Sequence, residues 1–198
     1  MTAQTLRQLT GASPVPAPLG RSALVVIDAQ NTYTTGVMRL EGVEAALAET
    51  RTLLDRARAQ GRPVIHIVHD DGPGSLYDVR APIGRIVDSV APLPDEPVII
   101  KTYPSSFERT DLAERLRALG VEALVLAGFM THMCVNSTAR AAFNHGFRPT
   151  VVAAATATRA LPRPGGGELS AAAVHDAALA ALADLFAVVV PRAADVPD

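Results

Sequence analysis

Short, largely apolar runs alternate along this chain with longer segments in which apolar residues recur at helical spacing. The runs span residues 22–27, 63–68, 97–100, 121–127, 149–154 and 185–190. Each is the pattern of a strand buried on both faces, which is typical of parallel sheets. The helical segments span residues 42–60, 110–119, 134–145 and 170–183. Strands that alternate with helices predict an α/β fold, with a six-stranded, mostly parallel sheet between two helical layers in a three-layer α/β/α arrangement.

The length of 198 residues fits a single domain with a substantial core. We assign residues 21–192 to this domain and expect residues 1–20, which are rich in proline at their end, to form an extended N-terminal arm. The arm lacks the basic start and apolar core of a signal peptide, and Asp176 and Asp184 interrupt the longest candidate for a membrane span. A net charge of −2 gives no field that attracts nucleic acid or an anionic membrane.

The chain has one cysteine, Cys134, which excludes an internal disulfide framework and favours a reducing compartment, so we expect a cytoplasmic protein. Cys134 follows the apolar run 121–127 across a short turn and comes at the start of an alanine-rich helix. Unpaired N–H groups and the positive end of the helix dipole favour an anion there and lower a thiol pKa. The alternative is a buried structural cysteine, a common environment for a free thiol.

Two charged residues, Asp28 and Lys101, stand at the ends of other predicted strands. Among the 18 Lys and Arg residues only Lys101 is a lysine, whose compact charge arginine cannot imitate. Ligands of parallel sheets bind beyond the carboxyl ends of the strands, which is where Asp28, Lys101 and Cys134 would meet. A cysteine nucleophile needs a base and a cation, roles that fit Asp28 and Lys101. Taken singly, Asp28 also fits an ordinary turn and Lys101 a solvated surface.

Three motifs carry these residues: Val-Ile-Asp-Ala-Gln-Asn around Asp28, Lys-Thr-Tyr-Pro-Ser-Ser-Phe from Lys101, and Gly-Phe-Met-Thr-His-Met-Cys-Val around Cys134. In this order and spacing, over about residues 20–190, the chain resembles the isochorismatase-like cysteine hydrolases. That superfamily includes nicotinamidases, N-carbamoylsarcosine amidase and streptothricin hydrolase. The resemblance implies a Rossmann-like sheet with strand order 3-2-1-4-5-6, a catalytic triad of Asp28, Lys101 and Cys134, no cofactor, and a homodimer or homotetramer.

The resemblance also implies a mechanism. A non-proline cis peptide bond, here expected at Met130–Thr131, would turn the Thr131 N–H towards the substrate beside the Cys134 N–H, and two such donors form an oxyanion hole. Cys134 would attack a carbonyl and form a thioester, Asp28 would protonate the departing amine and then activate water, and Lys101 would stabilise the charged pair. We therefore predict an amidase-like hydrolase that cleaves a C–N bond in a small amide, lactam or carbamoyl compound.

Residues near the triad in the sequence are candidates for the substrate pocket. Only 4% of the chain is aromatic, so we expect Tyr33, Tyr103 and Phe107 to form pocket walls, with ordinary packing as the alternative. His69 lies just beyond a strand end and is expected to line the pocket. The nucleophile turn supplies Met130 and His132. His132 either contacts substrate or orients the turn.

We expect no metal site. Nicotinamidase relatives often carry an Asp-x-His element after the second strand, and residues 66–71 do not match it. His66 and His69 are three positions apart on an extended strand, so their side chains face opposite sides of the sheet and cannot chelate one ion together. His66 is interpreted as a core residue.

Two rival functions remain open. Vinyl-ether hydrolysis, as in isochorismatase itself, does not require a thiol nucleophile. A non-catalytic module that binds a nucleotide or flavin is the other rival, although no G-x-G-x-x-G or P-loop motif follows a predicted strand.

Overall fold

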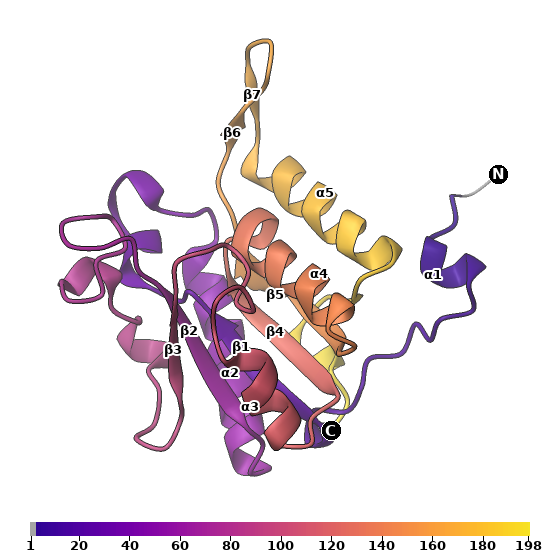
Figure 1. Ribbon diagram of the computed structural model, residues 1–198. Helices are drawn as coiled ribbons and strands as arrows, with labels where there is room; N and C mark the ends of the chain where they lie inside the picture. Colours follow the sequence, from indigo (N-terminus) through magenta and orange to yellow (C-terminus); the bar gives the residue numbers. More distant parts are fainter. Residues whose placement is uncertain (1–2) are drawn as a thin grey trace.

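A computed structural model describes residues 3–198 and shows a six-stranded sheet in which every neighbouring pair of strands is parallel (Figure 1). The strand order is β3-β2-β1-β4-β5-β8. Because β8 is the sixth strand of this sheet along the chain, this is the predicted order. In sheet order the strands are β3 Val98–Lys101, β2 Val64–His69, β1 Ser22–Ile27, β4 Ala123–Phe129, β5 Arg148–Ala157 and β8 Val188–Val190.

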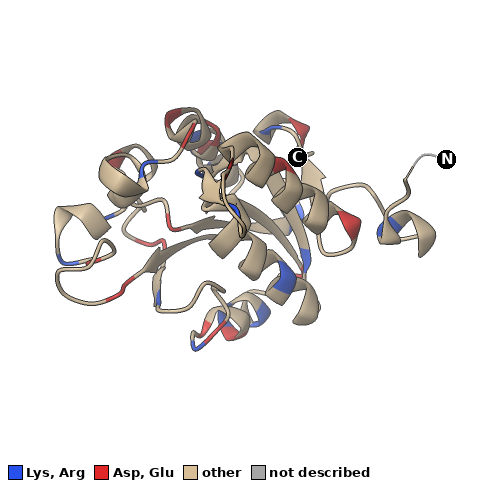
Figure 2. Cartoon of the chain, turned by 90° about the horizontal axis from the view of Figure 1, so that it is seen from above, with Lys and Arg blue, Asp and Glu red and all other residues tan. Residues whose placement is uncertain are grey.

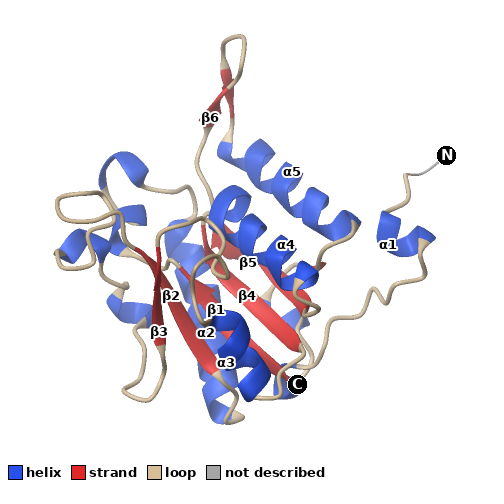
Figure 3. Cartoon of the chain, viewed as in Figure 1, coloured by secondary structure: helices blue, strands red, loops and turns tan. Residues whose placement is uncertain are grey.

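Helices cover both faces of the sheet, as predicted (Figures 1 and 3). One face packs against α2 (Val43–Ala59), and the other packs against α3 (Leu112–Ala118), α4 (Asn136–Asn144) and α5 (Ala171–Asp184). Alternate residues of β1 belong to the two different hydrophobic clusters, Leu24 and Val26 to the α2 side and Val25 and Ile27 to the other side. This alternation explains why the strand is apolar at every position.

The first long helix shows how the sequence pattern becomes packing. α2 begins after Gly42, whose φ of 70° suits glycine, and ends just before Gln60 and Gly61. Its apolar residues recur at helical spacing and face the sheet. Burial of each large side chain contributes about 1.5–3 kcal/mol to stability. The buried apolar residues of α2 are Val43, Ala46, Leu47, Leu53, Leu54 and Ala57.

The structure corrects the expected elements at three places. The loop expected at residues 163–167 is present, but it is flanked by two short strands that the sequence pattern did not predict. β6 (Leu161–Pro162) and β7 (Glu168–Leu169) form an antiparallel hairpin that projects from the body (Figure 1). The apolar runs also misplace the bounds of two strands, because β5 continues to Ala157 and β8 begins only at Val188.

Charged residues of both signs occur on both helical layers (Figure 2).

The third correction concerns the N-terminal arm, which is not extended throughout. It contains one helical turn, α1 (Leu6–Leu9), because Thr5 and Gln8 form a reciprocal capping box. The Leu6 N–H donates to the Asp184 carboxylate at 2.9 Å, and Arg7 donates to the Leu185 carbonyl at 3.1 Å, so this turn docks at the end of α5. Within residues 3–198, no helix combines the length and the apolar character that a membrane crossing requires.

The strand register brings the predicted site residues to one edge of the sheet. Ile27 pairs with Ile67 on β2 and with Gly128 on β4, and His69 pairs with Lys101 across β2 and β3. Gly128 has a φ of +112°, and a Cβ there would lie 1.9 Å from the Ile27 carbonyl oxygen. Only glycine therefore permits this approach of β4 to β1, immediately before Asp28 on one strand and the nucleophile turn on the other.

Candidate active site

Asp28, Lys101 and Cys134 converge beyond the carboxyl ends of β1, β3 and β4. The Lys101 Nζ lies 2.7 Å from the Asp28 Oδ2 and 3.4 Å from the Cys134 Sγ. The three residues are almost excluded from solvent, with exposed fractions of 0%, 1% and 6% for Asp28, Lys101 and Cys134. A buried lysine requires compensation of its charge, and the Asp28 carboxylate supplies it.

The backbone at Asp28 is left-handed, with φ at 48°, a conformation that non-glycine residues rarely adopt outside functional sites. The Asp28 N–H donates to the Ile67 carbonyl at 2.9 Å, and its carbonyl accepts from the Gln30 N–H at 2.8 Å. Burial raises the pKa of Asp28, and the Lys101 ammonium opposes this shift. Within residues 3–198 neither buried carboxylate oxygen of Asp28 has a hydrogen-bond partner, and Lys101 meets Oδ2 as an ion pair, so the carboxylate can accept a proton.

Cys134 lies in one wide helical turn, residues 131–135, which leads directly into α4. Burial and the neighbouring Asp28 carboxylate raise the pKa of the Cys134 thiol to about 12, although the Lys101 ammonium acts in the opposite direction. The expectation of a lowered thiol pKa is therefore wrong for the protein without substrate. Desolvation and a nearby negative charge outweigh the helix terminus and the lysine, so the sulfur is protonated at neutral pH.

The cis peptide bond lies one residue earlier than expected, at Phe129–Met130 instead of Met130–Thr131. β4 continues through Phe129, which pairs with Ala157, and the helical turn already begins at Thr131. Met130 is therefore the single residue between strand and turn. Its carbonyl accepts the N–H groups of Met133 at 3.0 Å and Val135 at 3.3 Å.

Two side chains of the nucleophile turn are held from outside it. The Oγ1 of Thr131, which is fully buried, lies 3.0 Å from the Nδ1 of His175 on α5. The Nδ1 of His132 lies 2.6 Å from the Oγ1 of Thr158, just after β5. Burial, together with the nearby Arg159 cation, lowers the pKa of His132. The structure thus gives His132 an orienting contact, one of the two roles considered from the sequence.

Aromatic rings form a wall beside the triad. Tyr33 is buried, and its ring packs edge-on against Tyr77 and Phe129, with centroids 5.9 and 5.7 Å away. The two tyrosine hydroxyls are 3.2 Å apart. Burial is the main cause that raises the pKa of both tyrosines, and the charge of Asp28 contributes to both shifts. Both rings therefore lie near Asp28 and Cys134, and Tyr77 is a neighbour of the triad that sequence reasoning missed. That Tyr33 forms a wall of the substrate pocket stays a prediction.

His69 also reaches the site. Its ring packs edge-on against Tyr77 with centroids 5.0 Å apart, and its Nδ1 lies 3.1 Å from the Lys101 Nζ. Gln30 fixes its backbone, because the Gln30 Oε1 accepts from the His69 N–H at 2.9 Å and the Gln30 Nε2 donates to the His69 carbonyl at 3.0 Å. The same Nε2 donates to the Gly84 carbonyl at 2.6 Å, so Gln30 joins β2 to the far end of the loop that follows it.

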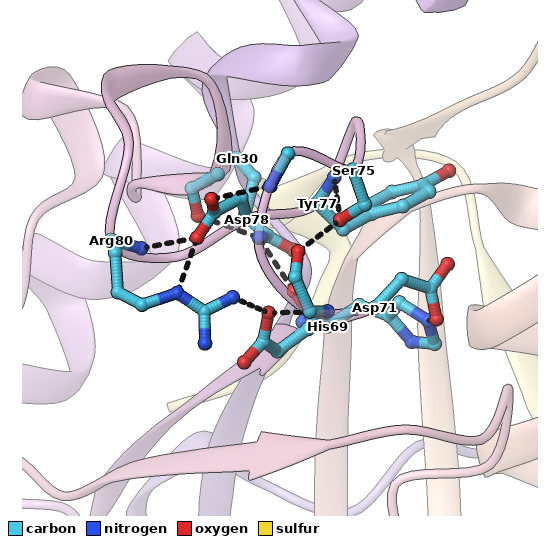
Figure 4. Close-up of polar contacts among 11 residues, drawn as sticks. Gln30, His69, Asp71, Ser75, Tyr77, Asp78 and Arg80 are labelled. Atoms are coloured by element: carbon cyan, nitrogen blue, oxygen red, sulfur yellow. Dashed lines mark hydrogen bonds and ion pairs between the residues drawn. The ribbon is translucent and has the colours of Figure 1, made fainter.

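The loop that carries Tyr77 is ordered by its own polar contacts (Figure 4). The Asp78 carboxylate accepts from the Gly74 N–H at 2.8 Å and from the Arg80 Nε at 2.6 Å. Arg80 also reaches Asp70, with its Nη2 3.0 Å from the Oδ1. These bonds hold Tyr77 against His69 and Tyr33. The residues between 70 and 86 are rich in glycine and proline and give no periodic signal from which this arrangement follows.

Two expected pocket residues lie elsewhere. Phe107 stacks on His145 and Phe147, with centroids 5.0 and 5.8 Å away, at the opposite end of α4 from Cys134. Tyr103 is 36% exposed and lies under the Arg109 guanidinium. Phe107 and Tyr103 therefore fit ordinary packing, the alternative to a pocket wall, because each side chain contacts neighbours outside the triad.

The histidine on β2 behaves as interpreted. His66 is buried, and its Nε2 lies 3.1 Å from the Glu96 Oε2 on the opposite side from the triad cation. Burial is the main cause that lowers its pKa. In the part of the chain that the structure describes, no group of three or more His, Cys, Asp or Glu side chains is arranged to hold a metal ion.

A parallel α/β sheet with a buried Asp–Lys–Cys cluster at its carboxyl edge has the layout of an α/β hydrolase. Residues 22–194 match the family described as the isochorismatase domain, and the chain belongs to this family. The resemblance drawn from the three motifs is thereby confirmed.

Named relatives and a solved structure extend the comparison. The chain is 34% identical to the secreted isochorismatase effector Isc1 of Verticillium dahliae, over 94% of this chain and 96% of that protein. It is 35% identical to maleamate amidohydrolase of Pseudomonas putida, over 67% of this chain and 70% of that protein. The crystal structure of an isochorismatase from Pseudomonas putida matches with a TM-score of 0.94 at 39% identity, covering 98% of this chain and all of that one.

Proposed function

We propose that this protein is a cysteine-dependent hydrolase that cleaves a C–N bond in a small amide, lactam or carbamoyl compound through a thioester. The observation that supports this proposal best is the position of the Lys101 ammonium, 2.7 Å from a carboxylate oxygen and 3.4 Å from the thiol sulfur. A nucleophile, a base and a cation in contact are the elements of covalent acyl transfer.

In the first step Asp28 takes the thiol proton as the Cys134 sulfur attacks the substrate carbonyl carbon. The raised pKa of Cys134 means that a proton is present to be removed, and the raised pKa of Asp28 makes that carboxylate a stronger base than an exposed one. The negative charge moves to the carbonyl oxygen. The Lys101 ammonium offsets this negative charge both before and after the transfer.

The Cys134 amide, with the Thr131 amide of the same turn, is the proposed oxyanion hole, although the cis bond that led to the choice of Thr131 lies at Phe129–Met130. Among residues 3–198, neither N–H donates to a group outside the nucleophile turn, which supports their availability to a substrate. In the second step protonated Asp28 gives its proton to the amine nitrogen, the C–N bond breaks, and the carbonyl carbon remains bound to sulfur as a thioester. Asp28 then deprotonates a water molecule, whose oxygen attacks the thioester, and the thiol and a carboxylic acid are formed.

The nearly buried thiol favours a small substrate, or one whose reactive end is slender, since only 6% of Cys134 is exposed. Vinyl-ether hydrolysis remains the alternative within the family. The contact of the thiol with a cation that is itself paired with a carboxylate favours the amide reaction, and the name of maleamate amidohydrolase points in the same direction. We further propose a reducing compartment, which the single free cysteine supports. The homodimer or homotetramer is proposed from the family resemblance alone.

An ammonia-release screen tests the proposal. Purified protein would be incubated with nicotinamide, ureido acids, small carboxamides and lactams, and lactam opening would be followed by mass spectrometry. We expect turnover of at least one amide by the wild type and none by Cys134→Ser. Turnover of a vinyl ether by both proteins, with no amide cleaved, would establish the alternative reaction.

A further inference from the structure

The Lys101 ammonium has three neighbours that can accept a hydrogen bond. Besides Asp28 Oδ2 at 2.7 Å and Cys134 Sγ at 3.4 Å, the Nδ1 of His69 lies 3.1 Å from Nζ. An ammonium group has three N–H donors and no acceptor. The three neighbours match the three donors in number, as hydrogen bonds with His69 and Cys134 and an ion pair with Asp28, around a lysine that is 1% exposed.

This arrangement determines the tautomer of His69. Since the ammonium can only donate, Nδ1 must accept, so the ring proton resides on Nε2. The Nε2 lies 2.9 Å from the Oδ1 of Asp71, which accepts that proton's hydrogen bond. A carboxylate that fixes one ring nitrogen as a donor makes the other nitrogen an acceptor.

The His69 ring is held independently of the lysine. Gln30 binds both backbone groups of His69, at 2.9 and 3.0 Å, and the Tyr77 ring packs against the imidazole. Figure 4 shows Gln30, Tyr77 and Asp71 around His69, with Asp71 on the loop beyond β2. The imidazole is thus a fixed point against which a long, flexible lysine side chain can be placed.

We propose that His69 is a positioning residue for Lys101 and that Asp71 sets the tautomer of His69. Asp71, His69 and Lys101 then form a chain of polar contacts, called the relay below, that ends at Asp28 and Cys134. Its catalytic consequence rests on the function proposed above, whereas its effect on thiol reactivity does not. Without the His69 acceptor, one buried N–H of the ammonium has no partner. The Nζ then leaves its place between carboxylate and sulfur to find one.

Three variants separate this role from simple packing against Tyr77. His69→Asn places its Oδ1 near the position of Nδ1 and keeps an acceptor, whereas His69→Leu keeps the bulk and removes it. Asp71→Asn alters a half-exposed side chain and leaves the core untouched. We expect kcat to fall about 30-fold in His69→Leu with KM within about twofold, because Lys101 is misplaced and the substrate contacts are not. His69→Asn should stay within about fivefold of wild type, and Asp71→Asn should lose about threefold.

A readout that needs no substrate completes the test. Alkylation of Cys134 by iodoacetamide, followed by intact mass, should slow about tenfold in His69→Leu and not in His69→Asn, because the thiolate loses its cation. Equal behaviour of His69→Leu and His69→Asn, or an unchanged Asp71→Asn, would overturn the relay. If no amide is cleaved by any protein, alkylation still decides the relay, and the proposed function fails separately.

Discussion

The Lys101 Nζ and the Asp28 Oδ2 lie 2.7 Å apart with both side chains fully buried. A buried ion pair gains little net stability, because the cost of desolvating two charges offsets their attraction. Losing one partner is different, since the remaining charge is buried without compensation. The pair is therefore best understood as part of the reaction site, and this interpretation has consequences that can be measured.

Removal of either charge should destabilise the protein more than removal of both. We expect Asp28→Asn and Lys101→Met each to lower the free energy of unfolding by about 3–5 kcal/mol, and the double variant to lower it by less than either. Urea unfolding of the four proteins gives these values. All three variants should be inactive, so stability and activity separate in the double variant. Additive losses in the double variant would contradict a direct pairing.

The pKa of Cys134 predicts how stability depends on pH. Because the folded protein holds the thiol proton more tightly than the unfolded chain, this contribution is complete below the ordinary value of 9.0 and is lost as pH rises towards about 12. Between those values wild type should lose about 1.4 kcal/mol per pH unit relative to Cys134→Ser. Chemical unfolding of both proteins at about pH 8 and about pH 10.5 measures the difference. A constant difference would mean that the thiol holds its proton equally tightly in the folded and the unfolded protein.

Gln30 should prove essential for the loop that carries Tyr77. Gln30→Glu keeps the shape but places a carboxylate oxygen where Nε2 now donates to the His69 and Gly84 carbonyls. We expect a loss of about 3 kcal/mol at neutral pH and faster hydrogen exchange over residues 72–85, with partial recovery in acid as the new carboxyl is protonated. Gln4→Glu, at an exposed position of the N-terminal arm, is the control and should cost no more than about 0.5 kcal/mol.

Gly128 should not tolerate a side chain. In Gly128→Ala the new Cβ would lie 1.9 Å from the Ile27 carbonyl oxygen, so β4 must move away from β1, and we expect little folded protein. Gly120→Ala is the matched control, since its φ is +64° but nothing lies within 4 Å of the added atom. It should cost about 1 kcal/mol. Circular dichroism and thermal melting distinguish the two, and a stable Gly128→Ala protein would contradict the close strand approach.

Much of the fold was predictable because buried parallel strands are apolar at every position. The run at residues 22–27 becomes β1 with both faces covered, and Ser170 caps α5 as its side chain suggests. The elements that were missed depend on local turn geometry or docking. α1 rests on a capping box and a contact with Asp184, and the hairpin of β6 and β7 is too short to show periodicity.

The triad residues were predictable because each follows a strand end in a recognisable motif. Their surroundings were not, since the contacts join residues far apart in sequence: Tyr33 and Tyr77 are separated by 44 positions, and so are Thr131 and His175. The raised thiol pKa was missed because the sequence shows a helix N-terminus but not the depth of burial. The contact between His69 and Lys101 had a signal, because both residues end neighbouring strands in the expected order.

The covalent step is the central claim, and trapping with hydroxylamine tests it most directly. Hydroxylamine competes with water for a thioester, so wild-type protein turning over an amide substrate should yield the hydroxamate as well as the acid, and intact mass should show the acyl group on Cys134. Cys134→Ser and Asp28→Asn should yield neither. Amide hydrolysis by Cys134→Ser at the wild-type rate, with no hydroxamate from either protein, would contradict a thioester at Cys134.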